Sequence, residues 1–142
     1  MIGINNTGWT VGFYVDSVGL THGFTFNTPT YTTVDAPGTA FNQLLGINDS
    51  LTTVGYSSTD PTGATLQMSF KVSGGTFTYI SGFPTGTGNQ AVGINNAGTA
   101  VGFYLDSGGV PRIYRRRHDS EYVRRILQRG TGYLGVRYQQ PR

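Results

Sequence analysis

The sequence predicts an all-β protein, an incomplete β-propeller-like array of four-stranded units with a period of about 45 residues. Residues 3–19 ("GINNTGWTVGFYVDSVG") are similar to residues 46–63 and 93–109, and the three segments begin 43 and 47 residues apart. Within each unit, short runs of β-branched and aromatic residues alternate with Gly, Asn and Asp, which is typical of strands and turns. Four strands in a unit of this length match one propeller blade.

The strands are expected in the same order in every unit. The first, at 41–48 in the second unit, ends in an Asn-Asp pair, and such side chains bond the backbone of turns. Gly8 and Gly98 supply a positive φ for a tight hairpin with a bulge into the second strand. Leu51 occupies this position in the second unit, so a different turn is expected there.

The second strand ends at an aspartate that is followed three residues later by glycine, the preference of a type I turn. The three aspartates are Asp16, Asp60 and Asp106. Each turn has one carboxylate and calcium needs several, so we expect these side chains to cap turns. Third strands are expected at 20–27 and 65–73, and fourth strands at 30–35 and 75–81, where Pro and Gly then reverse the chain.

The C-terminal part of the chain has a different composition. Residues 1–110, with units starting near 3, 46 and 93, contain one Lys and no Arg, whereas residues 111–142 contain nine Arg. We therefore expect a β-repeat region over 1–110 and an irregular or short-helical basic tail over 111–142. Residues 120–129 have an apolar i, i+4 stripe and capping residues that favour a short helix.

A shifted reading frame is the favoured interpretation of this tail. If residues 111–113 (Pro-Arg-Ile) are encoded CCA-CGG-ATT, reading one base later gives His-Gly-Phe, which the repeat requires there. Residues 137–140 can likewise yield Gly-Ile-Asn-Asn. A packed helix and a basic nucleic-acid-binding tail stay open as alternatives, although Arg-rich runs attract phosphates without specificity and nucleic acid is disfavoured. The nucleotide sequence across codons 105–142 decides between them.

No catalytic constellation is evident in the sequence. There is no Cys, and the sequence lacks a G-x-S-x-G motif and a phosphate-binding loop. His22 is the only His in residues 1–110, so it is expected to be hydrogen-bonded within its unit rather than to act as a base or metal ligand. Glycines within Val-Gly-aromatic triplets (Gly12, Gly55 and Gly102) indicate close strand packing. We expect no enzyme activity, cofactor, metal, export signal or membrane span.

The motif Gly-Ile-Asn-Asn-x-Gly-x-x-Val-Gly-Phe-Tyr-x-Asp at 3–16 is followed by His22-Gly23-Phe24 and by a Thr-Thr-Val-Asp-x-Pro-Gly run at 32–38. Together these resemble the bacterial "probable extracellular repeat" family, named for its His-Ala-Phe (HAF) tripeptide. The resemblance covers about residues 2–110 and is weaker in the second unit, where Met68-Ser69-Phe70 replaces the tripeptide. It implies a secreted, propeller-like protein.

These observations favour a noncatalytic secreted repeat or scaffold module that binds carbohydrate or cell-surface material. Aromatic side chains near the recurrent turns can stack on sugars, although such residues also form cores. The ligand-binding candidates are Trp9, Tyr14, His22, Tyr56 and Tyr104. Self-association through exposed strand edges is a further expectation. The alternatives are a fragment of a propeller enzyme acting on polysaccharide and a nucleic-acid binder that uses the basic tail.

Overall fold

The computed structural model describes residues 1–83 and 88–116, and in these residues it contains eleven strands and no helix, which confirms the all-β prediction. Unit 1 comprises β1 (Gly3–Ile4), β2 (Thr10–Val15), β3 (Thr21–Asn27) and β4 (Thr30–Val34). Unit 2 comprises β5 (Phe41–Ile47), β6 (Thr53–Ser58), β7 (Met68–Ser73) and β8 (Thr76–Tyr79). Unit 3 comprises β9 (Asn89–Ile94), β10 (Ala100–Leu105) and β11 (Pro111–Arg116).

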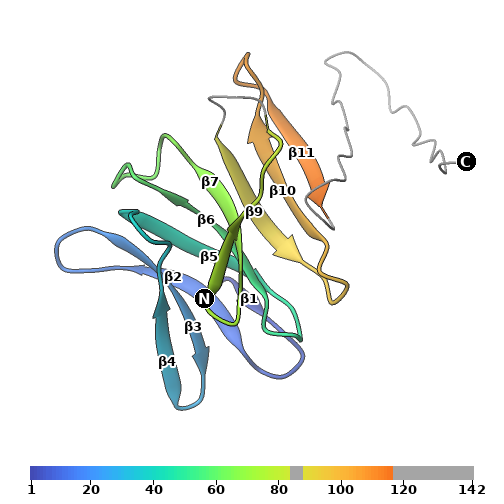
Figure 1. Cartoon of the computed structure of the whole chain (residues 1–142). Coiled ribbons are helices and arrows are strands. Elements are labelled where there is room, and N and C mark those ends of the chain that lie inside the picture. The colour runs from blue at the N-terminus through green and yellow to red at the C-terminus, as the bar shows by residue number, and fades with distance from the viewer. Residues whose placement is uncertain (84–87, 117–142) are drawn as a thin grey trace, which may run out of the picture.

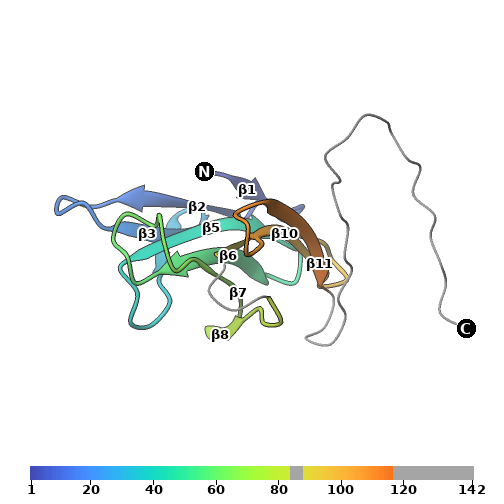
Figure 2. The same ribbon diagram turned by 90° about the horizontal axis from the view of Figure 1, so that it is seen from above.

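Each unit is an antiparallel meander, because successive strands within it pair with one another. A single parallel pair, Thr21 with Phe41, joins units 1 and 2, and unit 3 forms a separate sheet. Figures 1 and 2 show β3 and β11 at opposite ends of the molecule, with β5 and β6 between them. Across residues 1–83 and 88–116 the strands close neither a barrel nor a propeller.

The β-structure extends beyond residue 110 to Arg116, so the expectation of an irregular or short-helical tail is wrong for residues 111–116. Arg112 and Tyr114 in β11 pair with Tyr104 and Gly102, as His22 and Phe24 in β3 pair with Tyr14 and Gly12. Burial rather than polarity alternates here, since Tyr114 is buried between the exposed Ile113 and Arg115, as in a strand whose successive side chains point to opposite faces. The expected helix at 120–129 and the rest of the tail lie outside the described residues.

The units pack face to face, and two apolar clusters fill the spaces between them. We call the side of a unit that meets the preceding unit its front face and the opposite side its back face. In the first cluster, Val11 and Val34 on the back face of unit 1 meet the front face of unit 2; the front-face residues are Leu44, Phe70, Val72 and Phe77. In the second, Val54 and Ile80 on the back face of unit 2 meet the front face of unit 3; its residues are Ala91, Tyr104 and Tyr114. Each buried side chain of this size stabilises the fold by about 1.5–3 kcal/mol.

Asparagine and aspartate side chains also connect the units through their recurrent turns. Asn5 Nδ2 donates to the Asn48 carbonyl (3.0 Å), and Asn48 Nδ2 donates to the Asn95 carbonyl (3.1 Å). One residue further on, the backbone N–H of Asn6 donates to Asp49 Oδ1 (2.9 Å), and the backbone N–H of Asp49 donates to Asn96 Oδ1 (2.9 Å). These bonds join residues separated by one repeat, so they form a ladder across all three units.

The turn at Leu51 differs from the expectation. The Leu51 amide donates to the Asn48 carbonyl, as the Gly8 amide does to Asn5, and Leu51 has φ 58°, close to the φ of 76° at Gly98. The second unit therefore forms the same turn as the others, because the bonds that Asn48 makes to Thr52 and to unit 3 hold it in place. A left-handed backbone costs a residue with a side chain about 1–2 kcal/mol.

Replacing Leu51 with glycine is therefore expected to stabilise the protein by about 1 kcal/mol, since the turn is kept and its strain is removed. Urea unfolding followed by circular dichroism measures the change. Leu51→Ala is the matched control, because it shortens the side chain and keeps the strained φ. If both variants change the free energy of unfolding equally, the left-handed backbone is not the cause.

Candidate functional site

A groove of about 390 Å³ lies between units 1 and 2. Its walls come from the β1–β2 turn, from β3 and β4, and from the β5–β6 turn, β6, β7 and β8. The lining residues are Trp9, Thr25, Thr32, Thr33, Val34, Asp35, Ile47, Leu51, Thr53, Val72, Gly74, Gly75 and Phe77. The groove thus depends on the way two units pack, and neither unit forms it alone.

Local turn chemistry places the apolar side chains of the groove. The Trp9 amide donates to Asn5 Oδ1 (2.9 Å), which fixes the position of the indole directly after the Gly8 turn. Leu51 projects from the equivalent turn of unit 2. Phe77 follows the two positive-φ glycines, Gly74 and Gly75, of the β7–β8 hairpin, and its ring packs edge-on against Phe70 at 5.3 Å. The result is a groove with aromatic and aliphatic walls.

Hydroxyl groups supply most of the polar character of the groove, through threonines on β3, β4 and β6. The Thr53 side chain is 3% exposed, and its Oγ1 has no hydrogen-bond partner among the described residues. A buried hydroxyl without a partner is unfavourable by about 1–3 kcal/mol, so this atom gains a hydrogen bond if the groove admits a ligand or water to it. Asp35 is the carboxylate at the edge of the groove.

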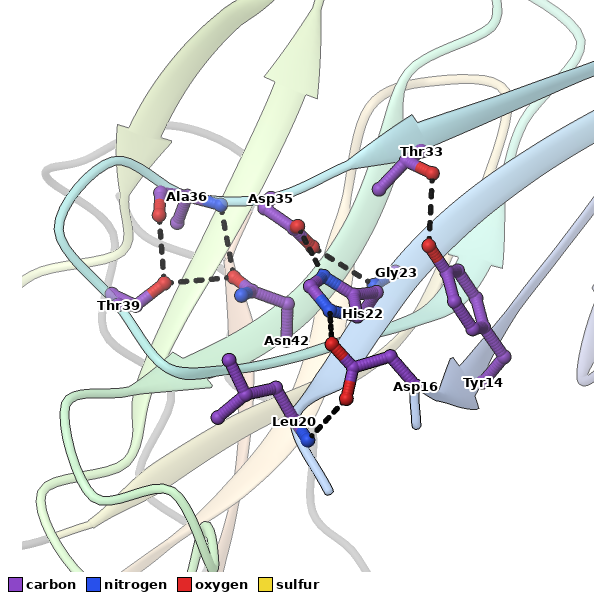
Figure 3. Close-up of polar contacts among 10 residues, drawn as sticks. All are labelled: Tyr14, Asp16, Leu20, His22, Gly23, Thr33, Asp35, Ala36, Thr39 and Asn42. Atoms are coloured by element: carbon purple, nitrogen blue, oxygen red, sulfur yellow. Dashed lines mark hydrogen bonds and ion pairs between the residues drawn. The ribbon is translucent and has the colours of Figure 1, made fainter. Parts of the chain in front are cut away.

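Asp35 connects the groove to the imidazole of His22, which lies between two carboxylates (Figure 3). His22 Nδ1 is 2.6 Å from Asp35 Oδ2, and His22 Nε2 is 3.2 Å from Asp16 Oδ2. The other oxygens accept from backbone amides, Asp35 Oδ1 from Gly23 and Asp16 Oδ1 from Leu20. Carboxylates only accept, so both ring nitrogens act as donors when the imidazole is protonated.

The two contacts stabilise the charged form of His22. The hydrogen bond to Asp35, followed by the one to Asp16, raises the pKa of His22 above its ordinary value. The backbone amide of Leu20 and the imidazole lower the pKa of Asp16. With both ring nitrogens engaged, His22 does not serve as a free general base. It joins β3 to the turns on either side, which confirms the expectation of a hydrogen-bonded histidine within its unit.

A pH-dependent contribution to stability follows from this arrangement. Because the pKa of His22 is raised in the folded protein, its contribution is fully present below the unfolded value of about 6.5 and is lost as pH rises through the folded value. Wild-type protein is expected to lose stability relative to His22→Gln as pH rises from about 6.5 through the raised pKa of the folded protein. Thermal unfolding of both proteins across this range tests it. A difference in Tm that stays constant with pH would contradict the assignment.

The structure distributes the five predicted ligand-binding residues over three environments. Trp9 lines the groove. Tyr14 and His22 stack on each other, with ring centroids 5.1 Å apart. Each also contacts a residue that lines the groove: the Tyr14 hydroxyl bonds the Thr33 hydroxyl (3.2 Å), and the His22 imidazole bonds Asp35. Tyr56 and Tyr104 are 7% and 6% exposed and belong to the interior. Tyr104 lies in the cluster between units 2 and 3, whereas the Tyr56 ring packs on Phe41 of its own unit, with ring centroids 5.6 Å apart. Both tyrosines are therefore removed from the candidate site.

The sequence did not indicate Thr53 or Phe77 as site residues. Both come from unit 2 and meet Trp9 only because unit 2 packs on unit 1. The high Thr content of 30–33 and 76–78 was the available signal, and it is equally typical of exposed strands.

The repeated aspartates cap turns, as expected. Asp106 Oδ1 accepts from the amides of Gly108 and Val110, and Asp16 Oδ1 does so from Val18 and Leu20. Bonds from Thr62 and Thr65 lower the pKa of Asp60 to about 2. Within the described part of the chain, no group of three or more His, Cys, Asp or Glu is arranged to hold a metal ion.

Comparisons with protein-family models, with curated proteins and with solved structures found no match to this chain. No helix within residues 1–83 and 88–116 has the length and apolar character needed to cross a membrane.

Proposed function

We propose that this chain is a noncatalytic repeat module that binds a neutral carbohydrate in the groove between units 1 and 2. The observation that carries the proposal is the combination of an aromatic wall, a row of threonine hydroxyls and the buried, unpartnered Thr53 Oγ1 in one groove of about 390 Å³. Sugars present apolar faces to aromatic rings and hydroxyls to polar groups. This volume suits one or two sugar rings.

The absence of catalysis is part of the proposal. Both nitrogens of His22 contact carboxylates, and Asp35 accepts from His22 and from the Gly23 amide. A general acid or base needs a proton that it can exchange with a substrate, and these groups are committed to one another. Binding without turnover is the function that this arrangement supports best.

Propeller-like stacking and an extracellular location also belong to the proposal. The units repeat the same antiparallel meander and pack face to face, which supports blade-like organisation. The resemblance of the motifs to HAF repeats supports a secreted protein.

Fluorescence offers a direct test, because Trp9 is the only tryptophan of the chain and lines the groove. The full chain is titrated with maltose, cellobiose and chitobiose. At least one sugar is expected to change Trp9 emission in a saturable way, with a Kd on the order of 1 mM. Chromatography of the same mixtures should show no sugar cleavage. No response to any neutral sugar would contradict the proposal.

Two hydroxyl deletions localise the binding. Thr53→Val keeps the side-chain shape and removes the hydroxyl in the groove, so sugar affinity is expected to fall about tenfold. Ser57→Ala is the matched control: its buried Oγ also has no partner among the described residues, but Ser57 does not line the groove. Equal effects of the two substitutions would place the sugar elsewhere.

A further inference from the structure

Within residues 1–83 and 88–116, two complementary faces have no neighbouring unit, the front face of unit 1 and the back face of unit 3. Phe24 pairs with Gly12 as Phe70 pairs with Gly55, and Tyr31 pairs with Phe26 as Phe77 pairs with Val72. Phe70 and Phe77 pack against unit 1, but Tyr31 is 49% exposed. The front face of unit 1 therefore presents aromatic residues where unit 2 has interface residues.

The back face of unit 3 is the matching surface. Val11, Val54 and Val101 occupy the same position in units 1, 2 and 3. Val11 and Val54 are fully buried beneath the next unit, whereas Val101 is 40% exposed. Ile113 lies on the same face of the unit 3 sheet and is also exposed.

The first strand of unit 3 also has a glycine where a further unit could approach its backbone closely. A Cβ added to Gly3 would lie 3.4 Å from the Cα of Gly46, and one added to Gly46 would lie 3.0 Å from the Cα of Gly93. These glycines let the first strands of successive units approach closely. Among the described residues, a Cβ on Gly93 meets only the Val101 side chain, at 3.4 Å. Gly93 therefore has room where Gly3 and Gly46 have a neighbouring strand.

The ladder of side-chain bonds has complementary ends at the same two faces. Asn5 and Asn48 each donate through Nδ2 to the carbonyl one unit further on, while Asn95 Nδ2 has no partner in residues 1–83 and 88–116. At the other end, the Asn5 carbonyl can accept such a bond. Asn6 can likewise accept from the Asn96 amide through its side-chain oxygen, as Asn96 accepts from Asp49.

We propose that two copies of this chain associate head to tail, with the back face of unit 3 of each copy packing on the front face of unit 1 of the other. The contacts repeat those between units 1 and 2 and between units 2 and 3. Two chains would supply six units, within the four to eight blades that propellers use, so the ring closes as a dimer. This association uses faces rather than strand edges, and it does not depend on sugar binding because the groove lies within one chain.

The oligomeric state of the full chain tests this proposal, with analytical ultracentrifugation at concentrations up to roughly 100 µM. Wild-type protein is expected to form a dimer. Val101→Glu on the back face of unit 3 and Tyr31→Glu on the front face of unit 1 should each be monomeric, since either change buries a carboxylate at both contacts of the ring. Both positions are exposed, so folding is expected to persist, which circular dichroism checks. Val18→Glu, at a turn position that is 77% exposed, is the matched control and should dimerise normally.

Mixing the two monomeric variants separates a head-to-tail contact from a symmetric one. Tyr31→Glu keeps an intact back face and Val101→Glu an intact front face, so an equimolar mixture should form a 1:1 complex through one native contact. A wild-type monomer, oligomers that grow beyond two chains, either variant dimerising by itself, or no complex in the mixture would overturn the proposal.

Discussion

Gly55→Ala is expected to abolish cooperative folding, with a loss of more than about 3 kcal/mol in the free energy of unfolding. An added Cβ would overlap the carbonyl oxygen of Gln43 and lie 3.1 Å from the Cα of Leu44. These are backbone atoms of the paired strand β5, beside the register shift between Leu44 and Gly46, so they cannot move without separating the strands. Urea unfolding followed by circular dichroism and Trp9 fluorescence measures the loss.

Gly93→Ala is the matched control for Gly55→Ala. Gly93 is also a strand glycine, but within the described part of the chain its added Cβ meets only Val101 Cγ2, at 3.4 Å. Since glycine within a strand is unfavourable relative to alanine by about 0.5–1 kcal/mol, this change should be neutral or slightly stabilising in the monomer. Similar losses for both variants would mean that strand glycines matter here through flexibility, and the proposed close approach would be wrong.

The elements of the fold could largely be predicted because their signals are local. The strand at 21–27, the Asp16 turn and the positive φ at Gly8 follow from alternation and turn preferences that act over a few residues. Leu51 shows where this fails. Its preference against a left-handed backbone is weaker than the turn and inter-unit bonds of Asn48, and the inter-unit bond joins Asn48 to a residue 47 positions away.

The candidate site could be predicted only in part, for a related reason. Trp9 was identified because it follows a recurrent turn. The groove around it is formed by Thr53 and Phe77 of the next unit, and the sequence does not give the distance between units. Tyr104 occupies the same repeat position as Tyr14, yet it is covered because it packs in the cluster between units 2 and 3, whereas no earlier unit lies against Tyr14 among the described residues. Exposure in a repeat protein depends on the position of a unit in the stack as well as on its motif.

Replacing Asn48, the central residue of the ladder, is expected to destabilise the protein strongly. Asn48 is 4% exposed, and its side chain bonds the Thr52 amide (2.9 Å) within the turn and the Asn95 carbonyl (3.1 Å) of unit 3. Asn48→Ala removes the acceptor of the Thr52 backbone amide and the donor to the Asn95 carbonyl. We expect it to lower the free energy of unfolding by about 2–3 kcal/mol, because two hydrogen bonds are lost at a buried position.

Asn95→Ala separates the inter-unit part of this effect from the turn. Asn95 Oδ1 accepts from the Thr99 amide (2.9 Å), as Asn48 Oδ1 does from Thr52, but Asn95 is exposed and bonds no later unit within residues 1–83 and 88–116. Its loss is expected to be about 1 kcal/mol or less in the monomer. Urea unfolding at protein concentrations below those that support association compares the two. Equal losses would show that the turn alone accounts for the role of this asparagine, and the ladder would then contribute nothing to holding the units together.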